Sequence, residues 1–282
     1  MPAVSVILST HNSPHFLEFV LTGYARQNVT DFEVVIADDG SREPTREFIK
    51  QVRPKLPFPL THVWQPHKGY YGKMSIMNRA IMAAQSDYLI LADGDVIPRH
   101  DFVKMHLTVR RPNCFIAGAD YRLMEQTTKS LTLDDVRSGR AFKLSFLRTI
   151  GQPLSRQFVK LLPATLFSLA FDAVNISPAR WSGSNAAAWK ADLIKVGGFD
   201  ETIHAPGKDD TELGHRLWNA GVKSRHARHN TICLHMYHGS GNYSTEGRKR
   251  NLEILQDTIK TKRTQARQGI PDIKVGDHTV ER

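Results

Sequence analysis

The chain has 282 residues, of which 40% are hydrophobic, and this composition is sufficient to bury a core and excludes a disordered protein. Its 38 lysine and arginine residues against 28 aspartate and glutamate residues give a net charge of +10, which favours anionic partners such as nucleotides, phosphorylated glycans, acidic lipids or nucleic acid. Cys114 and Cys233 are too few for a disulfide scaffold and lack zinc-site spacing, which is typical of a protein in a reducing compartment.

Strands and helices are predicted to alternate over the first hundred residues. Residues 3–9 form a short apolar run rich in β-branched side chains, and apolar residues recur with helical spacing over 16–26. The same alternation continues with strands at 32–37, 60–64 and 88–91 and helices at 43–52 and 71–84. It indicates parallel strands joined by right-handed crossovers, so residues 1–100 are predicted to form a nucleotide-binding α/β half.

Acidic residues directly follow the second and fourth predicted strands. Asp38 and Asp39 precede a Gly-Ser pair, and Asp93 and Asp95 flank a single glycine. Because the carboxyl ends of parallel strands meet at one edge of a sheet, we expect these acids to lie there together with Thr10. An Asp-Gly-Asp segment alone is more often an ordinary turn. At a strand end it favours a site for Mg²⁺ or Mn²⁺, which takes carboxylate oxygens and shares them with substrate phosphates.

The second half of the chain supplies further polar groups. Asp209 and Asp210 precede a predicted helix at 211–220, where the helix macrodipole favours acids; simple helix capping is the alternative interpretation. His235 and His238 follow a short strand-like run. A histidine in such a place is usually structural, but imidazole also suits Mn²⁺ and would complete a site begun by one carboxylate.

A basic and apolar segment lies between these two sets of acids. Residues 136–171 carry six basic residues and no acidic residue, with phenylalanines and leucines between them. Basic amphipathic helices commonly lie on anionic membrane surfaces, and a packed helical insertion with solvated cations is the alternative. The tail is predicted to continue as a basic helix from residue 248, and residues 271–282 are expected to be loosely ordered.

The sequence shows no pattern of a membrane span or a secretory signal. No segment reaches the roughly 18 apolar residues that a membrane span requires, and the amino terminus has no basic region followed by an apolar core. We therefore expect a cytoplasmic protein, with a peripheral position at the inner face of the cytoplasmic membrane as the second possibility.

Taken together and in this order, the motifs resemble those of family 2 glycosyltransferases, which have the GT-A fold. The resemblance rests on Thr-His-Asn at 10–12, Asp-Asp-Gly-Ser at 38–41, Asp-Gly-Asp at 93–95, Trp-Ser-Gly-Ser-Asn at 181–185, Gly-Gly-Phe-Asp-Glu at 197–201 and Asp-Asp-Thr-Glu-Leu at 209–213. The second half is most similar to the galactosyltransferase-like and chondroitin-polymerase-like branch.

The fold that this resemblance implies is an α/β domain with a mixed, mostly parallel sheet flanked by helices. The domain would cover residues 1–240, with the nucleotide-binding half at 1–100 and an acceptor half at 101–240. A basic helical insertion is expected at about 125–178, and a basic, helical C-terminal tail is expected at 241–282.

The resemblance also implies an inverting enzyme that moves a hexose or N-acetylhexosamine from a UDP-sugar. In this interpretation Asp38 accepts a hydrogen bond from the uracil imide, and Asp39 lies near the ribose. Asp95 ligates Mg²⁺ or Mn²⁺ against the diphosphate, and Asp93 contacts the ribose or reaches the metal through a water. Further contacts are expected from Thr10, Asn12 and Lys73 to the donor and from His235 and His238 to the metal.

The acceptor side follows from the chemistry of inversion. Direct displacement at the anomeric carbon requires a base that takes the proton of the attacking hydroxyl, and by resemblance this base maps to Asp210. Asp209 is expected to contact the acceptor or its loop, together with Trp181 and Asn185; an ordinary core tryptophan is the alternative for Trp181. The implied acceptor is a hydroxyl of a glycan or glycolipid of the cell-surface polysaccharide or lipopolysaccharide type.

Three other classes of protein are less consistent with these residues. A sugar-nucleotide nucleotidyltransferase would open with a glycine-rich phosphate loop after its first strand, whereas residues 10–14 contain no glycine. A nucleic-acid-binding protein would explain the net charge, but no binding motif is present and the clustered acids would repel a phosphate backbone. The presence of both Asp95 and Asp210 argues against a non-catalytic carbohydrate-binding relative, because such a protein would not require a metal ligand and a base together.

Overall fold

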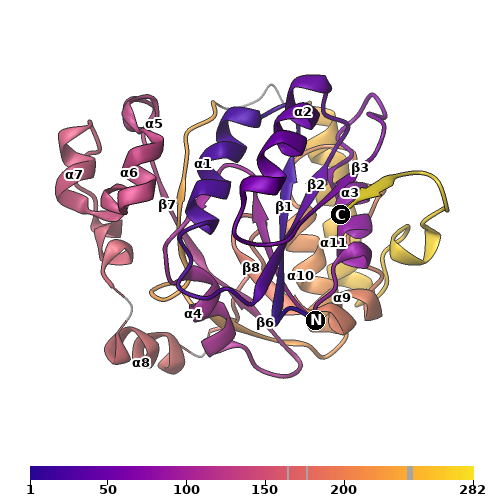
Figure 1. Ribbon diagram of the computed structural model, residues 1–282. Coiled ribbons are helices and arrows are strands. Elements are labelled where there is room, and N and C mark those ends of the chain that lie inside the picture. The colour runs from indigo at the N-terminus through magenta and orange to yellow at the C-terminus, as the bar shows by residue number, and fades with distance from the viewer. Residues whose placement is uncertain (164, 176, 240–243) are drawn as a thin grey trace.

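A computed structural model describes residues 1–163, 165–175, 177–239 and 244–282 (Figure 1). The large sheet has the strand order β11-β3-β2-β1-β4-β8-β6-β9, and a small sheet has the order β5-β10-β7. The strands are β1 (Val4–Thr10), β2 (Phe32–Asp38), β3 (Leu60–Trp64), β4 (Tyr88–Asp93), β5 (Val96–Pro98), β6 (Cys114–Ala117), β7 (Ala119–Arg122), β8 (Ala186–Trp189), β9 (Lys223–His226), β10 (Ile232–His235) and β11 (Thr279–Glu281).

Helices flank both sheets. They are α1 (Pro14–Tyr24), α2 (Glu43–Val52), α3 (Lys73–Ala83), α4 (Phe102–Val109), α5 (Glu125–Ser130), α6 (Leu133–Ser138), α7 (Leu144–Thr149), α8 (Leu166–Val174), α9 (Lys190–Lys195), α10 (Asp209–Asn219) and α11 (Thr245–Thr261). The described residues also form the short 3₁₀ turns η1 (Arg53–Lys55), η2 (Arg140–Phe142), η3 (Arg156–Leu161) and η4 (Ile270–Asp272).

The first four strands pair in parallel, as the alternation of strands and helices predicts. β1 lies between β2 and β4, and β3 pairs with the far side of β2. In this register Thr10 lies opposite Asp38, and Ser9 lies opposite Asp93. The antiparallel strand β8 then joins β4 to the second half of the chain. The sheet is therefore mixed and mostly parallel, which confirms the predicted fold class.

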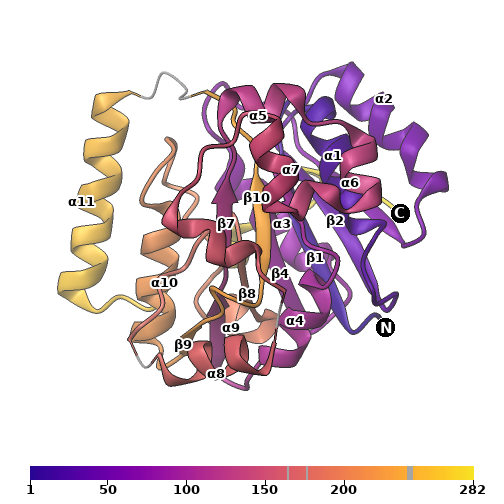
Figure 2. The same cartoon turned by 90° about the vertical axis from the view of Figure 1, so that its left-hand side faces the viewer.

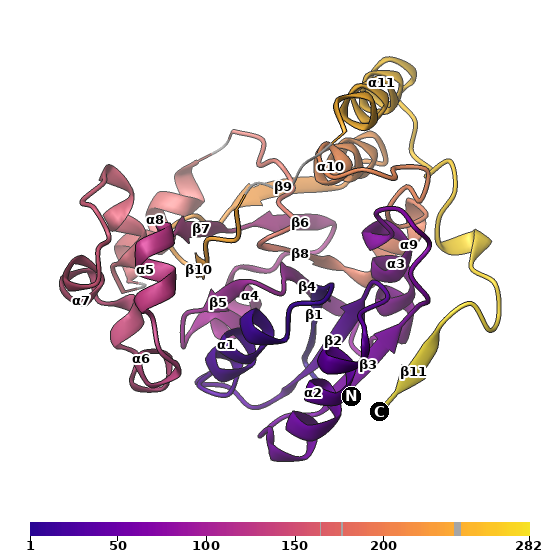
Figure 3. The same cartoon turned by 90° about the horizontal axis from the view of Figure 1, so that it is seen from above.

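Two apolar cores cover the two faces of the large sheet, because consecutive side chains of a strand point to opposite faces. In β1, Val6 and Leu8 belong to the core beneath α1, whereas Ile7 belongs to the core beneath α3. Figure 3 shows α1, α2 and α4 on one side of the sheet and α3, α9 and α10 on the other. Burial on both faces explains why these strands are continuous apolar runs without polar alternation.

The insertion forms a group of short helices beside the main body. Helices α5 to α7 form one group, and α8 lies apart from them against β9; Figure 2 shows this side facing the viewer. The structure thus confirms that the basic segment is helical. Within the described ranges, no helix combines the length and the hydropathy that crossing a membrane requires.

The C-terminal segment is more ordered than the sequence suggests. After α11, which packs against α10, the chain crosses to the free edge of β3 and adds β11 as an antiparallel strand. On the way, Asp277 forms an ion pair with the buried Arg79, which also pairs with Glu201. The expectation of loose order at 271–282 is therefore wrong. The edge strand β3 offers unpaired backbone groups to any segment that reaches it. The sequence of three residues does not reveal that they will pair with such an edge.

Candidate active site

The carboxyl ends of β1, β2 and β4 open onto a cavity of about 610 Å³. Thr10, Asp39, Lys73, Asp95 and His238 all line it, so residues from both halves of the sequence meet at this edge of the sheet. An adjoining cavity shares Thr10, Lys73, Asp95 and His238 and adds Asp93. The structure therefore brings most of the predicted donor and metal residues to one place.

Asp38 and Asp39 turn in opposite directions at the end of β2. The Asp38 carboxylate is fully buried, accepts a hydrogen bond from the backbone N–H of Ser41 and lies 3.0 Å from His62 Nε2. The Asp39 carboxylate lies in the cavity wall. The predicted contact between Asp38 and uracil does not fit this arrangement, because a side chain without exposed surface cannot meet the base. Asp39 is the acid that faces the cavity.

Hydrogen bonds hold the Asp39 carboxylate in one orientation. Its Oδ1 accepts a bond of 2.7 Å from Gln65 Nε2, and its Oδ2 accepts a bond of 2.8 Å from the Gly72 backbone N–H. Both oxygens keep further lone pairs for a ligand, because an ionised carboxylate offers about four acceptor sites. The carboxylate is thus preorganised to accept another hydrogen bond from the cavity.

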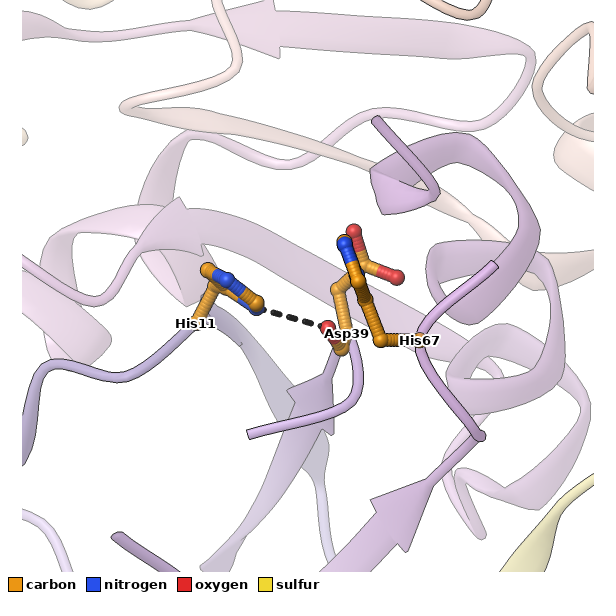
Figure 4. A group of neighbouring side chains, drawn as sticks. All are labelled: His11, Asp39 and His67. Atoms are coloured by element: carbon orange, nitrogen blue, oxygen red, sulfur yellow. Dashed lines mark hydrogen bonds between the residues drawn. The ribbon is translucent and has the colours of Figure 1, made fainter. Parts of the chain in front are cut away.

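Two histidines flank Asp39 (Figure 4). His11, in the loop after β1, places Nδ1 2.7 Å from the Asp39 carbonyl oxygen, and its ring lies 5.1 Å from the ring of His67, which follows β3. His11, His67 and Asp39 all line the cavity. No sequence motif singles out either histidine. The available signal was their position, since each follows a strand that ends at the same edge of the sheet.

Thr10 and Asn12 form the turn that carries His11. Thr10 lines the cavity, whereas Asn12 accepts a hydrogen bond from the Arg42 backbone N–H and thereby ties the loop after β1 to the loop after β2. Asn12 has a φ of 50°, a left-handed conformation that asparagine tolerates better than most residues. It lines neither of the two cavities, so its position supports a role in shaping the turn.

Asp93, Gly94 and Asp95 lie at the end of β4. Ser9 Oγ donates to Asp93 Oδ1 at 3.0 Å, and Lys73 Nζ donates to the same oxygen at 2.5 Å. Burial alone would raise the pKa of Asp93, but the Lys73 ammonium outweighs it and lowers this pKa. A Cβ atom on Gly94 would lie 2.5 Å from the Ser9 carbonyl oxygen. The glycine is therefore required by the close approach of β1, whatever ligand binds.

The three residues predicted to bind metal lie together. One ligand atom from each of Asp95, His235 and His238 lies within 4.8 Å of the other two, and His238 Nε2 lies 3.2 Å from Asp95 Oδ2. His235 reaches this group from the end of β10, and its other ring nitrogen lies 3.0 Å from Asp120 Oδ2. Burial disfavours a proton on His235, but Asp120 and Asp95 outweigh it and raise its pKa to about 10. Two carboxylates around one imidazole make a strong site for positive charge.

Asp209 and Asp210 open α10. Asp209 Oδ1 accepts a hydrogen bond of 3.0 Å from the Gly207 backbone N–H, which agrees with an orienting role at the start of the helix. Asp210 faces Gly183, where an added Cβ atom would lie 2.6 Å from Asp210 Oδ2. Burial, and then the charge of Asp209, raise the pKa of Asp210 to about 8, although Lys73 opposes this shift. A carboxyl group with such a pKa can exchange a proton near neutral pH.

Lys73 connects the two groups of acids. Burial disfavours its charge, but Asp93 and, less strongly, Tyr71, Asp210 and Asp209 outweigh this and raise its pKa. Coulomb interactions fall off with distance, so the influence of acids from β4 and from α10 on one ammonium places both groups of acids near Lys73. The donor side and the base side of the predicted site are therefore adjacent.

Two predicted acceptor residues are buried in the protein. Trp181 is 4% exposed and packs against Phe115, with ring centroids 5.5 Å apart. Asn185 has no exposed surface, and its Nδ2 donates to the carbonyl oxygens of Ala119 and Thr231. The predicted acceptor contacts are wrong for both side chains. Both residues instead anchor the ends of the segment that holds Gly183 beside Asp210.

Comparison with known proteins gives two family matches. A family described as glycosyl transferase family 2 matches residues 5–152, and one described as the N-terminal domain of galactosyltransferase matches residues 167–239. The two matches together cover both halves of the candidate site.

Three curated relatives cover most of this chain. An uncharacterized glycosyltransferase, YfnE of Bacillus subtilis, is 24% identical over 90% of the chain and 69% of its own length. Validoxylamine A glucosyltransferase of Streptomyces hygroscopicus is 28% identical over 79% of the chain, and chondroitin synthase of Escherichia coli is 26% identical over 79%. The chain spans 53% and 33% of the lengths of these last two proteins.

Solved structures with the GT-A fold superpose on the chain. Residues 1–349 of Staphylococcus aureus TarS, in complex with UDP-GlcNAc, have a TM-score of 0.58 and 15% identity, covering 95% of this chain and 68% of that one. The mannosyltransferase PcManGT from Pyrobaculum calidifontis, in complex with GDP-Man and Mn²⁺, has a TM-score of 0.54 and 16% identity, covering 83% of this chain and 56% of that one. At these identities the likeness shows the fold alone.

Proposed function

The chain belongs to glycosyl transferase family 2, and from this premise we propose that it is an inverting enzyme that transfers a hexose or N-acetylhexosamine from a UDP-sugar to a hydroxyl of a glycan or glycolipid. The observation that carries the proposal is the division of the site into two sides that meet at Lys73. On one side are Asp39 and the group of Asp95, His235 and His238; on the other is Asp210.

The donor nucleotide would lie along the cavity with its base at Asp39. A carboxylate accepts a hydrogen bond from an imide N–H, which uracil has and which cytosine lacks at the corresponding position. His11 and His67 would offer aromatic surface beside the base. TarS was solved in complex with UDP-GlcNAc and PcManGT in complex with GDP-Man, so nucleotide-sugar binding occurs in proteins of this fold.

The metal site fits a divalent cation. Among the described residues, Asp95 Oδ1 is buried and has no hydrogen-bond partner, and it faces the imidazole of His235 at 3.7 Å. A buried carboxylate oxygen left without a donor is what a bound cation would satisfy. One carboxylate with two imidazoles suits Mn²⁺ better than Mg²⁺, which prefers oxygen ligands. When bound there, the cation would neutralise charge on the departing diphosphate.

Asp210 would act as the base. Its Oδ1 is buried and has no hydrogen-bond partner in the described part of the chain, so it is free to accept the proton of an incoming hydroxyl. Lys73 lies between Asp210 and Asp93 and would hold a phosphate or keep the two groups of acids apart. Asp209 would orient the start of α10 and, through its charge, set the proton affinity of Asp210.

The acceptor class is suggested by one relative, chondroitin synthase, whose product is a polysaccharide. We propose a cell-surface polysaccharide or lipopolysaccharide acceptor that is reached from the cytoplasm.

The test is a panel of sugar nucleotides, assayed for donor hydrolysis and for transfer with NMR assignment of the product anomer. We expect UDP-sugars to be used and an inverted product, and Asp210→Asn should bind UDP like the wild type but lose turnover. A retained anomeric configuration would contradict the single-displacement mechanism.

A further inference from the structure

Helix α8 packs against the protein through its polar side chains. Ser168 Oγ donates to Asn230 Oδ1 at 2.8 Å, and Asn230 Nδ2 donates in turn to Asp172. The Asp172 carboxylate is 4% exposed and also lies 2.9 Å from His229 Nδ1. The residues that normally face water on an amphipathic helix are therefore turned inward here.

The opposite face of α8 is apolar and exposed. Phe167, Phe171 and Val174 are 79%, 67% and 73% exposed, and their spacing of four and three residues places them on one face of the helix. Exposed phenylalanines in such a row are uncommon on a surface that stays in water. The orientation of α8 is thus fixed by its buried polar bonds, and its apolar face is left for a partner.

The segment before α8 extends this surface. Arg99 donates to the carbonyl oxygen of Leu162, just after η3, and also to that of Asn230, which holds α8. The end of η3 and the base of α8 therefore share one support. Exposed apolar side chains of this segment are Leu154, Phe158, Val159 and Leu162. We call these residues, together with Phe167, Phe171 and Val174, the α8 surface.

Positive charge surrounds the α8 surface. Arg156 opens η3 and is exposed, as is Arg228 in the turn that supports α8. Acidic residues are absent from the sequence between 139 and 171, and the acid within α8, Asp172, is buried and paired. A second copy of this chain would bring the same positive charge against the surface, which disfavours self-association. An anionic lipid surface complements both the charge and the apolar side chains.

We propose that the α8 surface docks the protein peripherally on an anionic membrane, with the phenylalanines in the interface and the arginines at the lipid headgroups. The inference rests on the proposed function and deepens it. An enzyme docked on the membrane would be close to an acceptor saccharide that is attached to a membrane lipid. Figure 2 shows α8 on the same side of the molecule as α5, α7, β7 and β10, the last of which carries His235.

The test is co-sedimentation of the full chain with vesicles of phosphatidylglycerol and phosphatidylcholine, compared with vesicles of phosphatidylcholine alone. We expect binding to the anionic vesicles and a loss of at least about tenfold in affinity for Phe167→Ser/Phe171→Ser. Ile259→Ser is the control away from the α8 surface, because Ile259 is an exposed apolar residue, at 38%, on helix α11. Its binding should equal that of the wild type.

Several outcomes would overturn the proposal. One is a wild-type protein that stays in the supernatant with anionic vesicles, and another is a double variant that binds as the wild type does. A double variant that turns a dimer into a monomer in light scattering, without vesicle binding by the wild type, would assign the surface to self-association. UDP-sugar hydrolysis in solution is measured in parallel and should be equal in all variants, so failure of the proposed function is seen separately from failure of docking.

Discussion

The proton affinity of Asp210 gives the most detailed prediction. Burial and the charge of Asp209 raise its pKa to about 8, so at pH 7 only about one molecule in ten would carry the deprotonated base. Since the base must be deprotonated to accept the proton of the hydroxyl, kcat/KM should rise about tenfold for each pH unit below about 8 and level off above it.

The rise of kcat/KM with pH is called the pH limb. Removal of a neighbouring charge should shift this limb along the pH axis, in a direction that depends on the sign of the charge. Asp209→Asn removes a negative charge that raises the pKa of Asp210, so the limb should shift to lower pH. Lys73→Met removes a positive charge that lowers this pKa, so the limb should shift to higher pH, with a loss of rate besides. Both shifts follow from Coulomb interactions with the ionised carboxylate.

The assay is initial-rate kinetics with subsaturating UDP-sugar from pH 5.5 to about 9.5, a range chosen to extend beyond the expected limb on both sides. Mn²⁺ affinity is measured at each pH, because protons compete with a metal ion for its ligands and loss of the ion would also lower the rate. The assignment of the base would be refuted if the apparent pKa of the limb lay in the ordinary carboxyl range. It would also be refuted if Asp209→Asn did not shift the limb.

Three further predictions concern other parts of the site and fold. Asp39→Asn should weaken UDP binding about tenfold to a hundredfold, whereas Asp38→Asn should leave UDP affinity unchanged and lower Tm, as calorimetry would show. Gly183→Ala should lower kcat about 10²- to 10⁴-fold, because the new Cβ would displace the Asp210 carboxylate; the neighbouring Ser182→Ala serves as its control in the same assay. Arg79→Met should cost about 3–5 kcal/mol in denaturant unfolding, because it leaves Glu201 and Asp277 without their cation; an unchanged midpoint would show that the C-terminal segment does not depend on this pair.

The central fold was readable from the sequence because its strands are buried on both faces. Runs such as those at β1 and β2 have few other interpretations, and their alternation with helices leaves little freedom of topology. The strand β11 was not readable, because three exposed residues become a strand only through pairing with β3. The inverted orientation of α8 was also hidden, since its apolar spacing predicts a buried apolar face.

The sequence predicts those site residues that lie at the end of a single strand or helix. Asp93, Asp95 and Asp210 lie at strand or helix ends, which the pattern of apolar residues marks. The sequence could not separate Asp38 from Asp39, because adjacent residues point to opposite sides and the turn after β2 decides which one faces the cavity. His67 and Asp120 join the site from other elements, so only the tertiary structure shows their roles.

Calorimetric titration of UDP with and without Mn²⁺ tests the central claim most directly. Mn²⁺ should raise the affinity of the wild type for UDP, and this gain should disappear in Asp95→Ala, in which the carboxylate that joins His235 and His238 is lost. UDP binding that is indifferent to Mn²⁺, or a full gain retained by Asp95→Ala, would contradict the account.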